Sequence, residues 1–288
     1  IAADGDAMAV ERGFRRLREG GEVGIHPLLV DLTNPAPAQG WAHREWPSLA
    51  QRGPFDAVLC LALVHHLAIG NNVPLRGVAQ MLAELMRLRY GVAVAGSHGK
   101  TTTTSMVSAV LSHGGLDPTI VVGGKVKTMG TNARLGKGNF MVVEADESDG
   151  SFLLLSPVIS VLTNIDEEHL DHYKTFAGLE KAFSDFVNKV PFYGLSVLCT
   201  DCPNVKKIAE SFEKRAVTYG FNKDASLRAE NVKISGFRTD FDVILDGSPL
   251  GSISLNVPGM HNAQNALAAV AVGMELGMTF EQVREGLS

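Results

Sequence analysis

The sequence of 288 residues is 45% hydrophobic and 20% charged, so the chain can bury one large core or two modest ones. Its net charge of -5 and isoelectric point near 6.0 give no general attraction to phosphate backbones, which argues against a nucleic-acid partner. The longest apolar stretch, residues 57–69, is interrupted by His65 and His66, so we expect no membrane span. The composition therefore predicts a globular protein.

The cysteines and the chain ends give two further expectations. Three cysteines, Cys60, Cys199 and Cys202, are too few and odd in number for a disulfide framework. This favours a reducing compartment and, with no secretory signal at the start, a cytoplasmic location. The chain begins at Ile1 without a methionine and ends at Ser288 just after a predicted helix, so we expect both natural ends to be missing.

The first eighty residues alternate predicted strands and helices. Strands are expected at 1–6, 26–32 and 57–66, with helices over 8–19 and from Pro74 onward. Between the second and third strands, residues 34–54 are rich in proline and glycine and hold both tryptophans, which predicts a long surface loop.

From Gly91 onward, short valine-rich runs alternate with helical patterns, which is typical of a mainly parallel sheet covered by helices. Buried strands are predicted at 91–96, 140–145, 158–165 and 195–200, and helices at 101–112, 176–189 and 261–276. Residues 228–257 alternate in polarity and contain Asp-Gly and Gly turns, which predicts antiparallel hairpins. Thr279 and Gln282 predict a capping box for a final helix.

A glycine-lysine turn in AGSHGKTTTT joins the first of these strands to a helix. Such a junction presents unpaired N–H groups and the positive end of the helix dipole, so it can bind phosphate. Gly96 and Gly99 permit a tight curl, Lys100 supplies a cation, and the Thr101 hydroxyl can bind Mg²⁺. The general phosphate-loop pattern requires glycine where Val94 stands, so an ordinary turn with a surface lysine is the alternative.

Two further polar positions follow predicted strands. Glu144 ends the strand at 140–145, where a carboxylate can hold Mg²⁺ beside the Thr101 hydroxyl. Asp146, Glu147 and Asp149 crowd the same loop; Asp146 and Glu147 are second choices as the ligand, and a solvated acidic turn is the alternative. His169 follows the next strand by four residues and is either a ligand at the same edge or an ordinary surface histidine.

Four motifs, AGSHGKTTTTSM, EADESDGSF, TNIDEEHLDHY and PGMHNAQNALAA, occur in this order. Together they resemble the Mur ligases, ATP-dependent amide-forming ligases of peptidoglycan precursor synthesis, in which the short Gly-x-x-Gly-Lys-Thr turn makes Val94 no departure. The likeness is to the branch that joins L-alanine to UDP-N-acetylmuramate through an acyl phosphate. It implies an α/β fold with a mainly parallel, P-loop-type central domain over residues 81–288 and a small antiparallel hairpin region.

The resemblance also implies a set of site residues, with ATP and Mg²⁺ as cofactors. Lys100, Glu144 and His169 are the implied catalytic residues. The implied metal ligands are Thr101 and Glu144 for one Mg²⁺ and His169 for a second Mg²⁺. The basic, glycine-rich segment 123–138 is expected to approach the sugar nucleotide. Asn262 is also a candidate helix cap. The implied nucleotide contacts are Gly96, Ser97, His98, Gly99, Lys100, Thr101, Thr102, His261, Asn262 and Asn265.

Residues 1–80 resemble another family. IAADGDAMAVE, HPLLVDLTNPAPAQG and GPFDAVLCLALVHHLAIG are similar to class I S-adenosylmethionine-dependent methyltransferases. The resemblance places Asp4 or Asp6 at the ribose and Asp31 with Leu32 beside the adenine. The glycine-rich first strand and turn of that family are absent, so residues 1–80 are expected to be a partial Rossmann-like fragment.

The two resemblances meet between about Leu75 and Glu84, inside one predicted helix. Our hypothesis is a non-native join that leaves the ligase without the domains for its UDP end and its amino acid. We expect weak Mg-ATP binding and no turnover. The alternatives are a ligase that attaches a tripeptide to the same sugar, a methyltransferase, and an inactive nucleotide-binding fragment.

Overall fold

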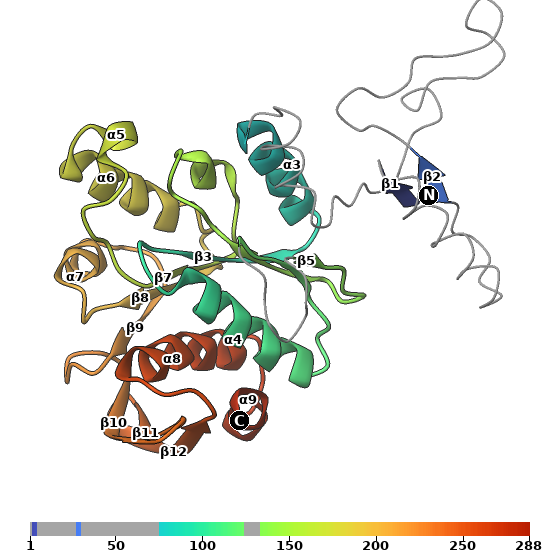
Figure 1. The fold of residues 1–288 in the computed structure, drawn as a ribbon. Coiled ribbons are helices and arrows are strands. Elements are labelled where there is room, and N and C mark those ends of the chain that lie inside the picture. The colour runs from blue at the N-terminus through green and yellow to red at the C-terminus, as the bar shows by residue number, and fades with distance from the viewer. Residues whose placement is uncertain (1, 5–26, 30–74, 124–132) are drawn as a thin grey trace, which may run out of the picture. The chain divides into compact units, whose positions relative to one another are not determined.

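The computed structural model describes residues 2–4, 27–29, 75–123 and 133–288. It divides into two compact units, and the described part of the larger one is built on a ten-stranded sheet (Figure 1). Its strands are β3 (Tyr90–Ala95), β4 (Thr119–Val121), β5 (Ala133–Arg134), β6 (Phe140–Glu144), β7 (Ile159–Leu162), β8 (Leu195–Cys199), β9 (Ala216–Gly220), β10 (Leu227–Ser235), β11 (Arg238–Leu245) and β12 (Ser248–Leu255).

Helices cover both faces of this sheet (Figure 1). They are α3 (Leu75–Arg87), α4 (Lys100–His113), α5 (Leu170–Tyr173), α6 (Phe176–Val187), α7 (Pro203–Glu210), α8 (Met260–Glu275) and α9 (Phe280–Leu287), with the short 3-10 helix η4 (Ser151–Leu154). In the part of the chain that the structure describes, no helix combines the length and the apolar character needed to cross a bilayer.

The strand order is β12-β11-β10-β9-β8-β7-β3-β6-β4-β5. Pairing is parallel from β10 through to β4, whereas β10, β11 and β12 form antiparallel pairs and β5 runs antiparallel to β4. This confirms the predicted α/β class, the mainly parallel sheet and the antiparallel hairpins.

Strand β3 explains why the core has two layers. Its side chains alternate between the faces, so Val92 and Val94 join one buried cluster while Ala93 and Ala95 join the other. The first cluster includes apolar residues of α4 and α8, and the second includes residues of α3, α6 and α7. Because both faces are covered, β3 is apolar along its length rather than alternating in polarity.

The predicted strands and helices after Gly91 are present, with ends that differ by up to three residues. The predicted capping box is confirmed: the Thr279 hydroxyl accepts from Gln282 N at 3.3 Å, and Gln282 Oε1 accepts from Thr279 N at 2.9 Å. The sequence did not predict β4, β5, β9, α5 or α7. Strands β4 and β5 and helices α5 and α7 are short, and β9 is only partly buried.

The smaller unit contributes one described feature, a parallel pair of β1 (Ala2–Asp4) and β2 (Pro27–Leu29). This pairing agrees with the two strands predicted in residues 1–6 and 26–32. The other predicted elements of the first seventy residues lie outside the described residues, as do Asp6, Asp31 and Leu32. Helix α3 runs without a break across the predicted junction between Leu75 and Glu84.

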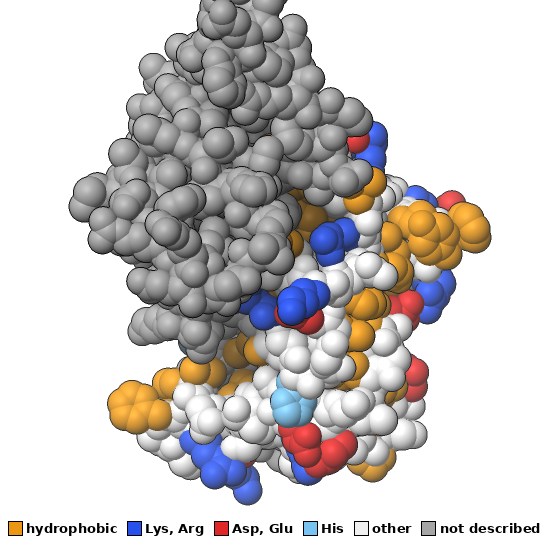
Figure 2. All heavy atoms as spheres, turned by 90° about the vertical axis from the view of Figure 1, so that its right-hand side faces the viewer, with side chains coloured by type: hydrophobic (Ala, Val, Ile, Leu, Met, Phe, Trp, Pro, Cys, Tyr) orange, Lys and Arg blue, Asp and Glu red, His pale blue; other side chains and the backbone are white. Residues whose placement is uncertain are grey.

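The described surface carries mixed charge. On the face in Figure 2, basic and acidic side chains are interspersed, and hydrophobic side chains reach the surface as separate groups. Phe192, Phe237 and Leu88 are among the large apolar side chains that are mostly exposed. Scattered exposed apolar residues are normal on a folded protein.

Candidate nucleotide site

The candidate site lies where β3, β6 and β7 end. Strand β3 lies between β6 and β7. The strands that follow β3 in the chain first add on one side of it, as β4 and β6, and then on the other side, as β7, β8 and β9. A parallel sheet binds ligands outside the carboxyl ends of its strands at such a switch point. The loop after β3 contains the glycine-lysine turn. Strand β6 ends at Glu144, with Glu147 in the loop that follows, and His169 lies in the loop after β7.

The glycine-lysine turn uses two glycines in positive-φ conformations. Gly96 has φ 137° and Gly99 has φ 80°, and Gly99 is the N-cap of α4 without a side-chain cap. A Cβ at Gly96 would lie 2.1 Å from Thr163 Oγ1 and 3.0 Å from Asn164 N. The turn therefore needs glycine both for its backbone angles and for its close packing, and it leaves the start of α4 open to an anion.

The residues after β7 hold this turn in place. Asn164 makes two bonds to the backbone of His98, since its Oδ1 accepts from His98 N at 2.7 Å and its Nδ2 donates to His98 O at 3.0 Å. Thr163 Oγ1 donates to the same His98 carbonyl at 2.7 Å. The buried Ser97 hydroxyl accepts from Asp166 N at 2.9 Å, so Ser97 serves the turn itself.

The Lys100 side chain folds over the turn and contacts the buried Glu147 carboxylate. Its Nζ donates to Gly96 O at 2.7 Å, to Ser97 O at 3.1 Å and to Glu147 Oε1 at 2.9 Å. The Glu147 side chain is 1% exposed and that of Lys100 15%. Burial raises the pKa of Glu147, and the Lys100 ammonium opposes that shift. Three acceptors satisfy the three ammonium protons, so a phosphate must take the place of at least one of them.

Thr101 and Glu144 form a second pair beside the first. The Thr101 hydroxyl donates to Glu144 Oε1 at 2.8 Å, and Glu144 Oε2 accepts from Gly123 N at 2.9 Å. Both groups offer the hard oxygen atoms that Mg²⁺ prefers, and the hydrogen bond already brings them together. This arrangement fits a magnesium ion held between the start of α4 and the end of β6.

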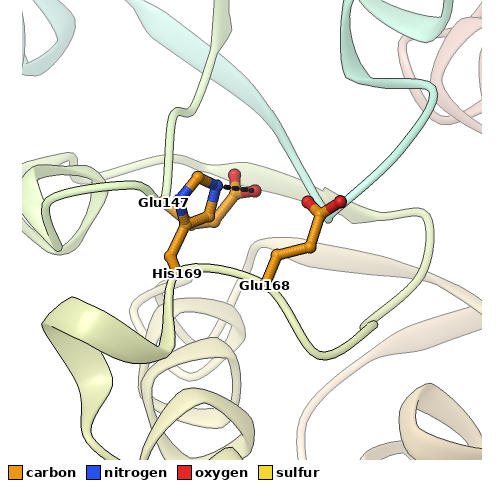
Figure 3. Close-up of side chains that lie close together, drawn as sticks. All are labelled: Glu147, Glu168 and His169. Atoms are coloured by element: carbon orange, nitrogen blue, oxygen red, sulfur yellow. Dashed lines mark ion pairs between the residues drawn. The ribbon is translucent and has the colours of Figure 1, made fainter.

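His169, the predicted ligand of a second Mg²⁺, lies apart from the pair of Thr101 and Glu144. Its Nε2 is 3.8 Å from Glu147 Oε1, and the two side chains face each other with Glu168 close by (Figure 3). Ligand atoms of Glu147, Glu168 and His169 all lie within 4.8 Å of one another. His169 itself adopts φ 56°, an uncommon angle for a residue with a side chain. The geometry thus groups His169 with Glu147, the second-choice carboxylate, and groups Thr101 with Glu144.

The first turn of α8, which packs against α4 on the same face of the sheet, lies beside the glycine-lysine turn. Asn265 is buried, and its Oδ1 is 3.0 Å from where a Cβ on Gly99 would lie. Asn262 Nδ2 donates to Pro258 O at 2.7 Å, so this amide stabilises its own turn. His261 is exposed at the start of the helix. The structure thus brings Asn265 to the glycine-lysine turn and gives Asn262 a structural contact.

The remaining predicted site residues are either exposed or paired with residues outside the site. Thr102 is exposed, and His98 Nε2 is 3.1 Å from Asp166 Oδ2 with both side chains mostly exposed. Arg134, in the basic segment, pairs with Asp117 at 3.1 Å and donates to Ser112 Oγ at 3.0 Å. Its charge is therefore used within the fold, and Lys125 and Lys127 of the same segment lie outside the described residues.

Sequence reasoning placed Glu147 second to Glu144 and did not assign it a partner. The spacing of the two glutamates is the signal that was missed. Glu144 ends β6 and Glu147 lies three residues later in the loop, so Glu144 can reach Thr101 while Glu147 reaches the neighbouring Lys100. Tyr173, from α5, adds a further support, because its hydroxyl donates to Glu147 O at 2.5 Å. Burial raises the pKa of the Tyr173 hydroxyl, which keeps it protonated as a donor.

Comparison with known proteins gives one family. Residues 94–273 match the family described as the Mur ligase middle domain. The chain is 56% identical over 219 residues to the UDP-N-acetylmuramate--L-alanine ligase of Trichlorobacter lovleyi, covering 75% of this chain and 48% of that protein. It is 57% identical over 216 residues to the enzyme of the same name from Anaeromyxobacter dehalogenans strain 2CP-1, covering 75% and 47%. The chain spans about half the length of the curated relatives it matches.

Solved structures give the same fold. A UDP-N-acetylmuramate:L-alanyl-gamma-D-glutamyl-meso-diaminopimelate ligase from Neisseria meningitides superposes with a TM-score of 0.66 at 29% identity, over 73% of this chain and 68% of that one. The UDP-N-acetylmuramate-alanine ligase from Thermotoga maritima superposes with a TM-score of 0.63 at 31% identity, over 71% and 46%.

Proposed function

The chain belongs to the Mur ligase family, and we propose that its residues 81–288 are the ATP-binding part of a ligase that joins L-alanine to UDP-N-acetylmuramate. The relatives that are 53–57% identical to this chain carry that activity in their names. The chain covers 46–48% of those relatives, so the complete reaction needs parts that lie beyond the aligned region.

One observation carries the nucleotide assignment: the hydrogen bond of 2.8 Å between the Thr101 hydroxyl and Glu144 Oε1, directly beside Lys100. It joins the start of α4 to the end of β6 with two magnesium-type ligands, next to a turn built for an anion. His169 is the proposed ligand of a second Mg²⁺. The proposed nucleotide contacts are Gly96, Ser97, His98, Gly99, Lys100, Thr101 and Thr102 for the phosphates, with His261, Asn262 and Asn265 for the nucleoside.

When bound, ATP supplies the phosphoryl group that activates a carboxylate for attack by an amine. The protein's own contribution to such a transfer is position and charge. The Lys100 ammonium would bind the phosphates, and Thr101 and Glu144 would supply oxygen ligands to the metal. The backbone at Gly96 and Gly99 would surround the anion. The turn, Thr101 and Glu144 are held in place by the packing of β3, α4 and β6, whereas Lys100 must release one of its protein acceptors when a phosphate binds.

Nucleotide binding by the chain itself tests this proposal. We expect titration calorimetry with Mg-ATP to give a measurable heat, and Lys100→Ala to weaken binding by about tenfold or more, since a charge-assisted contact is lost. Lys181→Ala is the matched control, because Lys181 is 73% exposed on α6 and pairs only with the exposed Asp185 among the described contacts. No binding by the unmodified chain, or equal affinity in Lys100→Ala, would contradict the proposal.

The metal ligands need their own test. Thr101→Val keeps the shape of the side chain and removes the hydroxyl that faces Glu144. We expect ATP affinity in this variant to lose most of its dependence on Mg²⁺, whereas affinity for ATP in EDTA stays close to that of the unmodified chain. An unchanged magnesium dependence would rule out Thr101 as a ligand.

The acceptor amine separates this function from its closest alternative. The Neisseria structure is named for a tripeptide acceptor and is 29% identical, whereas the curated relatives named for L-alanine reach 57%. We therefore favour L-alanine. Phosphate release with UDP-N-acetylmuramate, supplied with L-alanine or with the tripeptide, distinguishes the two in a full-length version of the enzyme, and we expect no turnover by this chain alone.

For residues 1–80 we propose a partial methyltransferase-like fragment joined to the ligase, and the parallel pair of β1 with β2 is compatible with it. We expect no S-adenosylmethionine binding by this chain. Binding detected by calorimetry would overturn this. A single genomic reading frame that continues both families through codons 70–90 would overturn the non-native join.

A further inference from the structure

A carboxylate outside the proposed phosphate contacts joins three distant segments at the end of β8. Asp201 Oδ2 accepts from Phe221 N at 2.7 Å and from Gln264 Nε2 at 2.7 Å, and Asp201 Oδ1 accepts from Asn222 N at 3.0 Å. Phe221 and Asn222 follow β9, and Gln264 lies in α8. Bonds to an ionised acceptor are about twice as strong as neutral ones, so this carboxylate is a strong link between the sheet and α8.

The packing around Asp201 shows that this contact is built into the backbone. Gly220 has φ 152°, and a Cβ there would lie 2.5 to 2.6 Å from the carboxylate atoms of Asp201. Only a residue without a side chain lets the end of β9 come this close to the carboxylate. The sequence therefore supplies both the acceptor and the glycine that admits it.

Gln264 connects this link to the proposed nucleoside contacts. His261, Gln264 and Asn265 are three or four positions apart or adjacent in the first turns of α8, so they share one side of the helix. The helix begins at Met260, and its N-cap residue Gly259 has no side chain to cap it. The bond that Gln264 donates to Asp201 therefore fixes the rotation of α8 about its axis. In this orientation Asn265 lies against the glycine-lysine turn at Gly99.

We propose that Asp201 is a positioning residue for the nucleoside end of ATP. It acts through Gln264: the carboxylate holds the first turn of α8 against β8 and β9, and that turn presents His261 and Asn265 to the bound nucleotide. This inference rests on the proposed function. It assigns Asp201 no contact with the phosphates, which are held by a different turn.

Two ligands separate positioning from general loss of structure. Mg-ATP engages both ends of the site, whereas magnesium tripolyphosphate engages only the phosphate end. We expect Asp201→Asn and Gln264→Ala to weaken ATP binding by about tenfold, since each removes a hydrogen bond to a charged group. Tripolyphosphate affinity should stay within about twofold of the unmodified chain, while Lys100→Ala should weaken both ligands.

Asp224→Asn is the matched control, because Asp224 is 82% exposed and pairs only with Lys206 among the described ion pairs. It should bind both ligands as the unmodified chain does. Gln264→Ala keeps the test decisive if Asp201→Asn does not fold, since it leaves Asp201 bonded to Phe221 and Asn222. Unchanged ATP affinity in Gln264→Ala, or equal losses for both ligands in that variant, would overturn the inference. Failure of the unmodified chain to bind ATP would instead contradict the proposed function.

Discussion

The two turns that meet at the carboxyl edge of the sheet are held by different chemistry. The turn from Gly96 to Lys100 is fixed by an ion pair and by side chains that follow the neighbouring strands. The turn from Pro258 to Asn262 is fixed mainly by neutral hydrogen bonds: Gly259 N donates to Thr239 Oγ1 at 3.0 Å, and Asn262 Nδ2 donates to Pro258 O. Charge is therefore concentrated where phosphate is expected, and neutral polar groups where a nucleoside is expected.

This difference suits a ligand such as ATP, whose phosphate end is charged and whose nucleoside end is neutral, at one edge of the sheet. At the Lys100 turn the protein's own carboxylate, Glu147, occupies the ammonium in the structure, so a phosphate replaces an existing partner. At the α8 turn the donors and acceptors satisfy one another and need no exchange. We expect loss of the Lys100 ammonium at the first turn to change phosphate affinity, and loss of the Thr239 hydroxyl that holds the second turn to change mainly stability.

The largest expected contrast comes from the two glycines. Gly96→Ala should lower the free energy of unfolding by about 3–5 kcal/mol, since its Cβ meets Thr163 Oγ1 at 2.1 Å and its φ is unfavourable. Gly259→Ala should cost about 1–2 kcal/mol, because its Cβ meets only the exposed His261 ring, which can move. Urea unfolding of both variants measures the contrast, and equal losses would contradict it.

A smaller effect is expected at the second turn from Thr239, which is fully buried in β11. Its hydroxyl donates to Val257 O at 2.9 Å and accepts from Gly259 N, so Thr239→Val loses both bonds. We expect a loss of about 2 kcal/mol in unfolding free energy. Thr239→Ser, which keeps the hydroxyl, is the control and should recover most of the polar contribution. A loss in the serine variant as large as in the valine variant would assign the effect to packing.

The smallest expected change in stability is at Glu147. Glu147→Gln keeps the side-chain shape and removes the negative charge beside Lys100, so we expect Mg-ATP to bind about three- to tenfold more tightly. Loss of the Glu147 charge removes the counter-charge of Lys100 but also removes a carboxylate that burial disfavours. Because these two effects oppose each other and Lys100 keeps its two carbonyl acceptors, the unfolding free energy near neutral pH should change by less than about 1 kcal/mol. Weaker ATP binding in the variant would show that Glu147 helps to hold the ligand.

The same variant has a defined pH dependence. Burial raises the pKa of Glu147 in the folded chain, so the protonated form is favoured by folding. Its contribution to stability is present below the ordinary glutamate pKa and is lost as pH rises through the folded pKa. The unmodified chain should therefore lose stability relative to Glu147→Gln as the pH rises above about 4.5. Urea unfolding of both proteins across this range measures the difference, and a difference of opposite sign would contradict the shift.

Much of the fold was predictable because it depends on local pattern. The strands β3, β6, β7 and β8 are short valine-rich runs, and Gly-containing turns mark the hairpins of β10 to β12. Segments such as β4, with three residues, and α7, with eight, carry too few positions for a period to emerge. Their structure comes from their place beside longer elements.

The residues of the candidate site were largely predictable from the sequence, but the contacts between their side chains were not. The turn, Glu144 and the asparagines of α8 follow from residue type at a strand or helix end. The partners of Lys100 and His169 could not be predicted, because Glu147 lies 47 residues from Lys100 and 22 from His169 in the chain. Contacts of this kind depend on which strands become neighbours.

The sequence by itself determined the class of the fold, the phosphate-type turn with its two glycines, and the capping box at Thr279, because each depends on residues within a few positions of one another. Only the tertiary structure decided that Glu147 holds Lys100, that Arg134 is paired with Asp117, and that Asp201 links β8 and β9 to α8. The physical reason is the order of strands in the sheet, which brings side chains from distant segments within hydrogen-bonding distance and thereby selects their partners.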